Sequence, residues 1–179
     1  MSGGRRALRW SVAVALLASV TGCAPGSPVP SPTPTGFASE EEAFAAAEAT
    51  YRAYVDALND VDLSDPATFE PVYALLAGDA LNGSKKELTS LHSEGLRKEG
   101  ETSLADVSLV EYSQASREAI LDVCLDVSDV EIRRPDGTSV VPDDRNDLQE
   151  LRVVLASVTP SGTDLRISSS QTQGDQPCG

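Results

Sequence analysis

The chain has 179 residues and a formal net charge of −14 at pH 7, and 40% of its residues are hydrophobic although only 4% are aromatic. The length allows one ordinary domain with a mainly aliphatic core. The acidic balance argues against nucleic-acid binding, which depends on basic contacts to phosphates. It also argues against adsorption to an anionic membrane by charge alone.

The first 22 residues follow the plan of a signal peptide. Arg5, Arg6 and Arg9 form a positively charged start, residues 10–20 are a short apolar run, and small residues follow. The apolar run is shorter than the roughly 20 residues that a transmembrane helix needs. We therefore expect residues 1–22 to direct export and to be removed.

The end of this segment, Val-Thr-Gly-Cys at residues 20–23, resembles a bacterial lipobox. The resemblance implies cleavage between Gly22 and Cys23 and attachment of a diacylglyceryl lipid to the Cys23 thiol, with palmitate as an expected acyl chain. More than one acyl chain gives stable anchoring. The expected location is the extracytoplasmic face of the cell membrane. The alternative is a secretory signal that contains a cysteine by coincidence.

A proline-rich tether is expected after the lipidated cysteine, so that residues 23–37 link the anchor to a domain at 38–179. Proline recurs five times between residues 25 and 34, which excludes a helix or a central strand. Such a segment is a semi-rigid spacer with a reach of roughly 40 Å. It would hold the domain away from the membrane.

Three helices are predicted in the first half of the domain. Ser39 and Glu42 form a capping box for a helix over residues 39–59, whose apolar residues recur at three- and four-residue spacing. A short second helix begins at Pro66 and is stopped by a glycine. A third helix is predicted over residues 84–98.

After residue 100 the hydrophobic pattern alternates, which predicts strands. The second strand has the clearest alternation, and its pattern allows it to continue to Ile132. These predictions describe an α+β fold, in which three N-terminal helices pack on one face of a curved, cone-like antiparallel sheet of about four strands. The strands are expected at residues 103–112, 121–127, 148–158 and 164–171.

This order of elements resembles the nuclear transport factor 2-like superfamily, which includes ketosteroid isomerase and SnoaL polyketide cyclases. More narrowly, the chain resembles small exported actinobacterial-type lipoproteins of high-GC Gram-positive bacteria. That resemblance uses the lipobox, the tether, the Asp136-Gly137 turn, a cysteine near the C-terminus, and the segments 51–54 (Tyr-Arg-Ala-Tyr) and 124–128 (Cys-Leu-Asp-Val-Ser). The fold implies a pocket between sheet and helices, and the superfamily contains both enzymes and non-enzymes.

Two cysteines, Cys124 and Cys178, remain once Cys23 carries lipid. An even pair in an oxidising compartment indicates a disulfide, which would hold the C-terminal tail against the outer face of the second strand. Two free thiols are the alternative.

No catalytic residue, metal site or cofactor is assigned from the sequence. Asp122 and Asp126 lie on the polar face of the second strand, roughly 13 Å apart, so they are expected to be solvated or paired with Arg152. His92, the only histidine, borders a helix face and is expected to be structural. The acidic run at residues 143–147 is interrupted by an arginine and does not match a calcium-binding loop.

The expected function is therefore that of a non-catalytic lipoprotein, held to the membrane by its N-terminal lipid, that binds a small apolar ligand or an envelope protein. One alternative is a small isomerase- or cyclase-like enzyme that uses a pocket carboxylate, His92 or Tyr54. Another is an assembly partner in an envelope complex, which would show a contiguous exposed apolar patch.

Overall fold

The computed structural model describes residues 36–174 and Cys178. The expected signal peptide, the lipid attachment site and most of the tether lie outside the described residues. Two long helices, one short helix and a 3₁₀ turn precede the strands in the chain. They are α1 (Glu40–Asn59), η1 (Pro66–Phe69), α2 (Glu70–Ala74) and α3 (Gly78–Ser93).

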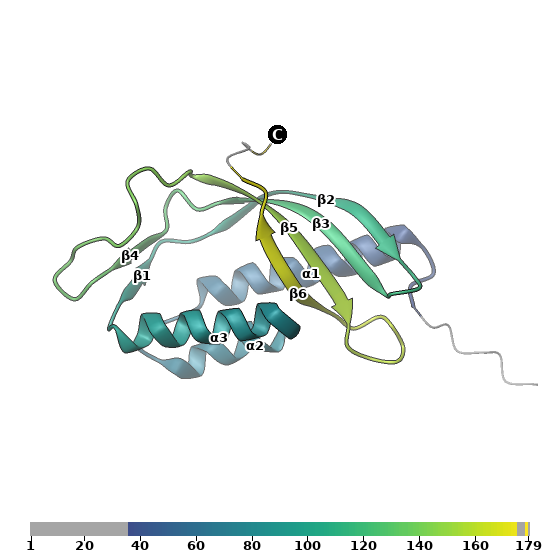
Figure 1. Cartoon of the computed structure of the whole chain (residues 1–179), viewed down its shortest axis with the longest axis horizontal. Helices are drawn as coiled ribbons and strands as arrows, with labels where there is room; N and C mark the ends of the chain where they lie inside the picture. The colour runs from purple at the N-terminus through teal and green to yellow at the C-terminus, as the bar shows by residue number, and fades with distance from the viewer. Residues whose placement is uncertain (1–35, 175–177, 179) are drawn as a thin grey trace, which may run out of the picture. The chain divides into compact units, whose positions relative to one another are not determined.

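Four antiparallel strands form the main sheet in the order β2-β3-β5-β6. Figure 1 shows the sheet twisting across the helices, which all lie on one side of it. The α+β fold expected from the sequence is thus confirmed, and the four expected strands are found within a few residues of their predicted ends. Their bounds are β2 (Ser103–Ser113), β3 (Glu118–Asp126), β5 (Leu148–Ser157) and β6 (Leu165–Thr172).

Helix α1 begins where its capping residues place it. The Glu42 amide donates to Ser39 Oγ at 3.1 Å, and the Glu42 carboxylate accepts from the Ala38 amide at 2.8 Å. These two bonds satisfy donors that the first helical turn leaves free. The buried face of the helix then lies against the sheet, through Ala43, Ala47, Tyr51, Val55 and Ala57.

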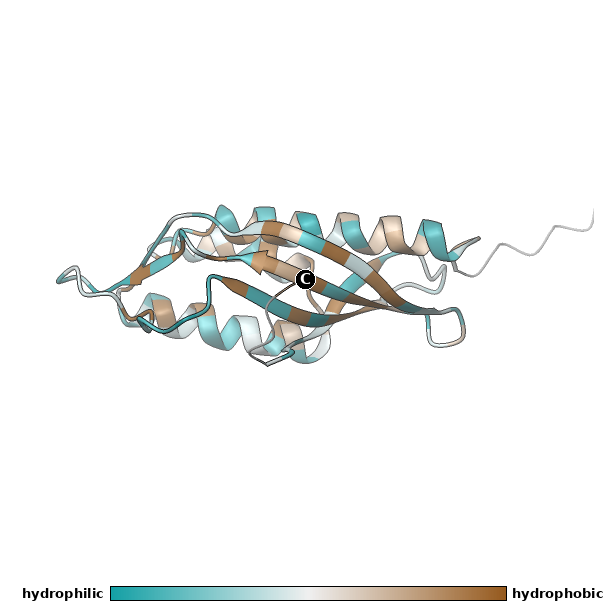
Figure 2. Ribbon diagram, turned by 90° about the horizontal axis from the view of Figure 1, so that it is seen from above, coloured by the Kyte–Doolittle hydropathy of each residue, from teal (hydrophilic) through white to brown (hydrophobic). Residues whose placement is uncertain are grey.

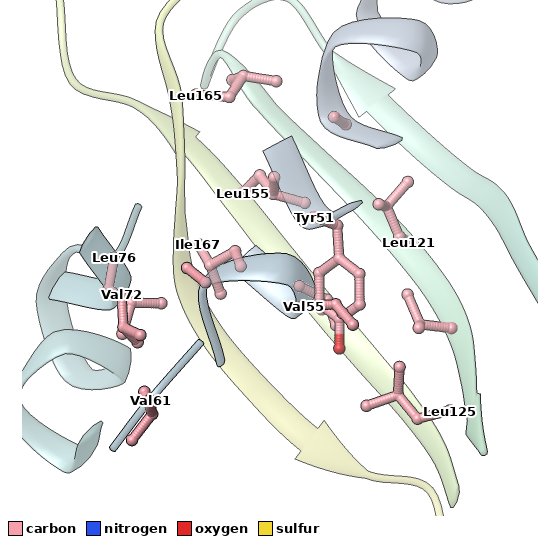
Figure 3. Close-up of a cluster of buried hydrophobic side chains, with 14 of the residues drawn as sticks. Tyr51, Val55, Val61, Val72, Leu76, Leu121, Leu125, Leu155, Leu165 and Ile167 are labelled. Atoms are coloured by element: carbon pink, nitrogen blue, oxygen red, sulfur yellow. The ribbon is translucent and has the colours of Figure 1, made fainter. Parts of the chain in front are cut away.

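The core lies between the helices and the sheet. Figure 3 shows Tyr51 and Val55 of α1 facing Leu121 and Leu125 of β3. Tyr51 is only 1% exposed, and it is among the largest fully buried side chains. Figure 2 shows the alternating hydropathy along the strands that creates this one-sided burial.

The third helix begins and ends earlier in the chain than the predicted residues 84–98. The structure starts α3 at Gly78, which the sequence analysis read as the stop of the preceding helix, and ends it at Ser93. The reason is tertiary: the Ala77 amide donates to the Ile167 carbonyl at 2.8 Å, and the Ile167 amide donates to the Leu75 carbonyl at 3.0 Å. This pairing with β6 ends α2 early and places residue 78 where a new helix can begin.

The residues after α3 form an additional small sheet that the sequence pattern did not predict. Strand β1 (Arg97–Glu99) pairs with β4 (Glu131–Arg133), so β3 ends at Asp126 and does not continue to Ile132. Gly100 follows β1 with φ of +73°, and a Cβ at this position would lie 1.8 Å from the Asp129 carbonyl oxygen. Only glycine allows the chain to pass that close.

The chain enters the domain next to the β5–β6 turn. The Gly36 amide donates to the Ser161 carbonyl at 2.7 Å, and Phe37 is buried edge-on against Tyr112, with ring centroids 5.8 Å apart. Among the helices of the described part of the chain, none has both the length and the apolar character needed to cross a membrane.

Candidate functional site

A cavity of about 610 Å³ lies between the helices and the main sheet, and side chains from β1 and β4 also line it. Its volume is within the range of small-molecule sites, which runs from about 300 to 1,000 Å³. About half of the lining residues are apolar. They are Tyr54, Leu58, Val61, Leu63, Leu76, Ala80, Leu88, Leu91, Ile132, Leu151 and Ile167.

Small residues on two facing elements leave this space open. Ala80, Gly83 and Ser84 lie on the cavity face of α3, and Ser169 and Ser170 of β6 also line the cavity. A Cβ at Gly83 would meet no atom within 4 Å. Larger residues at these positions would fill the gap, as core packing normally does. The cavity is thus a property of the sequence of α3 and β6.

Tyr54 is the aromatic residue of the cavity wall. It lies on α1 with its ring 5.7 Å from that of Tyr51, in a tilted arrangement. Burial raises the pKa of Tyr54 to about 12, and the negative charge of Glu87 adds to the shift. The phenol therefore stays protonated at neutral pH, so it can donate a hydrogen bond but does not act as a general base.

Lys98 brings a positive charge to the cavity from β1. Its Nζ donates to the Gly100 carbonyl at 3.1 Å and to the Asn59 carbonyl at 3.4 Å. Burial lowers the pKa of Lys98, while the carboxylates of Glu101 and Asp60 act in the opposite direction. Its bond to the Asn59 carbonyl joins the end of α1 to β1, beside the cavity that Lys98 helps to line.

His92 does not line the cavity, although its neighbours Leu88 and Leu91 do. Its Nδ1 lies 2.7 Å from the Leu63 carbonyl oxygen, and its ring lies edge-on to Phe69, with centroids 6.4 Å apart. The structure therefore gives His92 the structural position that the sequence analysis favoured.

The two aspartates of β3 have separate partners. Asp122 accepts two hydrogen bonds from Arg152, from Nε and from one terminal nitrogen, both at 2.9 Å. This is the cross-strand pair that the sequence predicted, because the two residues face each other in the register of β3 and β5. Asp126 accepts instead from the Ser128 amide at 3.0 Å, and hydrogen bonding from the side chain and then the backbone of Ser128 lowers the pKa of its carboxyl. The two do not form a site.

Cys124 and Cys178 lie at disulfide distance, with their Cα atoms 5.6 Å apart and a separation of 54 in sequence. Cys124 is buried although it lies on the outer face of β3, between two inward-facing residues. Cys178 thus lies beside β3, which is separated from the last strand, β6, by β5 in the sheet.

The loop at residues 143–147 serves the fold. Arg145 donates to the Val127 carbonyl at 2.7 Å, and the Val127 amide donates to the Asp147 carbonyl at 2.8 Å. These bonds attach the loop to the end of β3. Within the described residues, no three His, Cys, Asp or Glu side chains are grouped so that they could hold a metal ion.

Sequence reasoning missed Asp79, Ala80 and Gly83 as cavity residues of α3, because it placed the start of that helix at residue 84. Asp79, Gly83 and Glu87 recur at four-residue spacing and share one face of the helix, and all three line the cavity. With the correct helix start, this spacing would have pointed to them.

Comparison with known proteins shows the fold alone. No protein-family model matches the chain, and no curated protein does. Among solved structures, the chain is similar to the intermembrane space region of chloroplast protein ARC6, with 13% identity over 72% of this chain and 95% of that one and a TM-score of 0.50. It is also similar to a protein from Catenulispora acidiphila, with 15% identity over 75% of this chain and 92% of that one and a TM-score of 0.49. A structure from the same organism, in complex with S-DNPA, has 16% identity over 72% and 90% of the two chains and a TM-score of 0.47.

Proposed function

We propose that the chain is an extracytoplasmic lipoprotein, anchored through lipid on Cys23, whose nuclear transport factor 2-like domain binds a small apolar molecule. The observation that carries the binding role is the cavity of about 610 Å³, whose lining includes apolar side chains from both long helices and from both sheets. A bound apolar molecule would remove this apolar surface from water.

The anchoring part of the proposal is supported by the sequence of residues 1–36. A positive start, a short apolar run, a lipobox-like end and a proline-rich spacer follow each other in the order that an exported lipoprotein needs. The cysteine pair at disulfide distance is consistent with an oxidising compartment.

Binding of a small molecule is favoured over docking of an envelope protein on an apolar surface. The large hydrophobic residues that are exposed in the described part of the chain are Val110, Leu148 and Val158. Leu148 and Val158 lie at opposite ends of β5, roughly 30 Å apart along the strand. They do not form the contiguous patch that such a partner would use.

The enzymatic alternative would need a base inside the cavity. The carboxylates of the lining belong to Asp79 and Glu87, which occupy exposed positions of α3. Tyr54 holds its proton, and His92 is bonded to a backbone carbonyl. The cavity therefore favours binding without chemistry.

Ligand binding can be tested by native mass spectrometry of two exported proteins, the natural chain and a variant whose cavity is filled. We expect an added mass on the natural chain that disappears on denaturation. Gly83→Leu, which fills the open space beside α3, should lose that mass, whereas the matched Gly83→Ala should keep it. A natural chain and a Gly83→Leu chain that are equally free of added mass would contradict the binding role.

Anchoring can be tested separately in cells that export the chain. With an alkyne analogue of palmitate, we expect label on the natural chain and its recovery in the membrane fraction. Cys23→Ala should carry no label. Unlabelled natural chain released into the medium would contradict lipid anchoring without affecting the binding role.

A further inference from the structure

The charged residues of the cavity are distributed unevenly between its two sides. Asp79 and Glu87 belong to α3, and Lys98 belongs to β1. The lining thus has two carboxylates and one ammonium group, in a chain whose net charge is −14. The charge of the lining indicates which head group an apolar ligand can carry.

Lys98 is already engaged by the fold. Its Nζ bonds the carbonyls of Asn59 and Gly100, and the carboxylates of Asp60 and Glu101 lie near enough to raise its pKa against the effect of burial. An anionic head group at this end would compete with those carbonyls and face those carboxylates. The cavity therefore disfavours a fatty acid or another anionic amphiphile.

The two carboxylates of α3, in contrast to Lys98, are not engaged by the fold through ion pairs. Among the ion pairs of the described residues, none involves Asp79 or Glu87. Glu87 and Tyr54 line the same cavity, and the charge of Glu87 adds to the rise in the pKa of the phenol that burial causes. A carboxylate beside an aromatic ring attracts cations through both its charge and the electron-rich face of the ring.

We propose that the cavity takes a cationic amphiphile, whose apolar body lies among the leucines of α1 and α3 and whose ammonium head lies between Glu87 and Tyr54. This inference rests on the proposed binding function and names its ligand class. The small residues Gly83 and Ser84 are one turn before Glu87 on the same side of α3, so they leave room for the body of the ligand next to the head-group position.

The test uses three probes that share one alkyl chain and differ in charge: octyltrimethylammonium, octanol and octanoate at neutral pH. Binding to the full-length, oxidised chain is followed by the amide resonance of Ser84, which reports on the cavity wall. We expect octyltrimethylammonium to bind about tenfold more tightly than octanol, through the carboxylate and the ring. Octanoate should bind most weakly.

Two variants separate the head group from the cavity. Glu87→Gln should weaken binding of the cationic probe by about fivefold and leave the affinity for octanol unchanged. Glu111→Gln removes the same charge from an exposed position of β2 outside the lining, and it should change neither. Gly83→Leu should weaken all three probes.

The outcomes distinguish the two proposals. If octanol and octanoate bind as tightly as the cation, or if Glu87→Gln and Glu111→Gln behave alike, the cationic ligand class is wrong while the apolar binding function stands. If none of the probes shifts the Ser84 resonance of the natural chain, both the ligand class and the binding function are wrong.

Discussion

Two glycines of this fold have opposite roles, and replacing each of them with alanine distinguishes the two roles. Gly83 lies within a helix and faces open space, whereas Gly100 has a positive φ and lies against the Asp129 carbonyl. We expect Gly83→Ala to raise the free energy of unfolding by about 0.5–1 kcal/mol, because alanine is the better helix former. Gly100→Ala should lower it by more than about 1 kcal/mol. Urea unfolding midpoints check both, and a loss of stability in Gly83→Ala would contradict the open space.

The buried tyrosines make the protein sensitive to high pH. Burial raises the pKa of both Tyr51 and Tyr54, the latter to about 12. A phenol with a raised folded pKa binds more protons in the folded state than in the unfolded one between the two pKa values. Its contribution is therefore complete below pH ~10 and is lost as the pH rises, by about 1.4 kcal/mol for each unit between the two pKa values.

The measurement is the phenolate absorbance of the chain, which has four tyrosines, together with urea unfolding at several pH values. We expect Tyr54→Phe to remove one late-titrating phenol and to reduce the loss of stability above pH 10. If the phenol that Tyr54→Phe removes titrates at the ordinary pKa of free tyrosine, that result would contradict the buried position of Tyr54.

Among the helices, α1 depends on its cap. Ser39 accepts the Glu42 amide, and α1 supplies much of the helical side of the core. Ser39→Ala should cost about 1 kcal/mol of unfolding free energy. Ser93→Ala is the matched control, since its hydroxyl donates to the Ser90 carbonyl at an exposed helix end, and it should change stability by less than about 0.5 kcal/mol. Equal losses in thermal or urea unfolding would contradict a specific role for the cap.

Local sequence signals predicted the elements whose ends are set locally. The capping box of α1, the alternation in β3 and the turn at Asp136-Gly137 are such signals, and the structure has all three, with the Thr138 amide donating to Asp136 at 2.9 Å. The start of α3 depends on pairing with β6, about 90 residues later in the chain. Strands β1 and β4 are three residues each and pair with each other across a long stretch of sequence, and β4 also bridges to Ser139. No local pattern specifies these features.

At the scale of the whole domain, the sequence predicted that a cavity would exist but not which residues line it. The resemblance implied a pocket between sheet and helices, and Tyr54 was expected there. The other residues that line the cavity come from both long helices and from both sheets. Their meeting depends on how the sheet curves, which no single segment encodes. The isolated histidine was more conspicuous in the sequence, yet it lies outside the lining.

The C-terminal tail is joined to one of the two inner strands of the main sheet, because Cys178 lies at disulfide distance from Cys124 of β3. Linking the two cysteines restricts the unfolded chain, and a loop of 54 residues corresponds to about 4 kcal/mol in the chain-entropy account. We expect the double variant Cys124→Ser with Cys178→Ser to lose up to this amount in urea unfolding. The natural chain under reducing conditions should behave in the same way.

The position of Cys124 supplies an independent measurement. It is 5% exposed. In Cys178→Ser, which leaves Cys124 without its disulfide partner, the Cys124 thiol should become open to a maleimide reagent, while the natural oxidised chain should react at neither Cys124 nor Cys178. Peptide mapping without reduction should recover the two cysteines in one linked peptide. Labelling of either thiol in the natural exported chain would show that the pair is free.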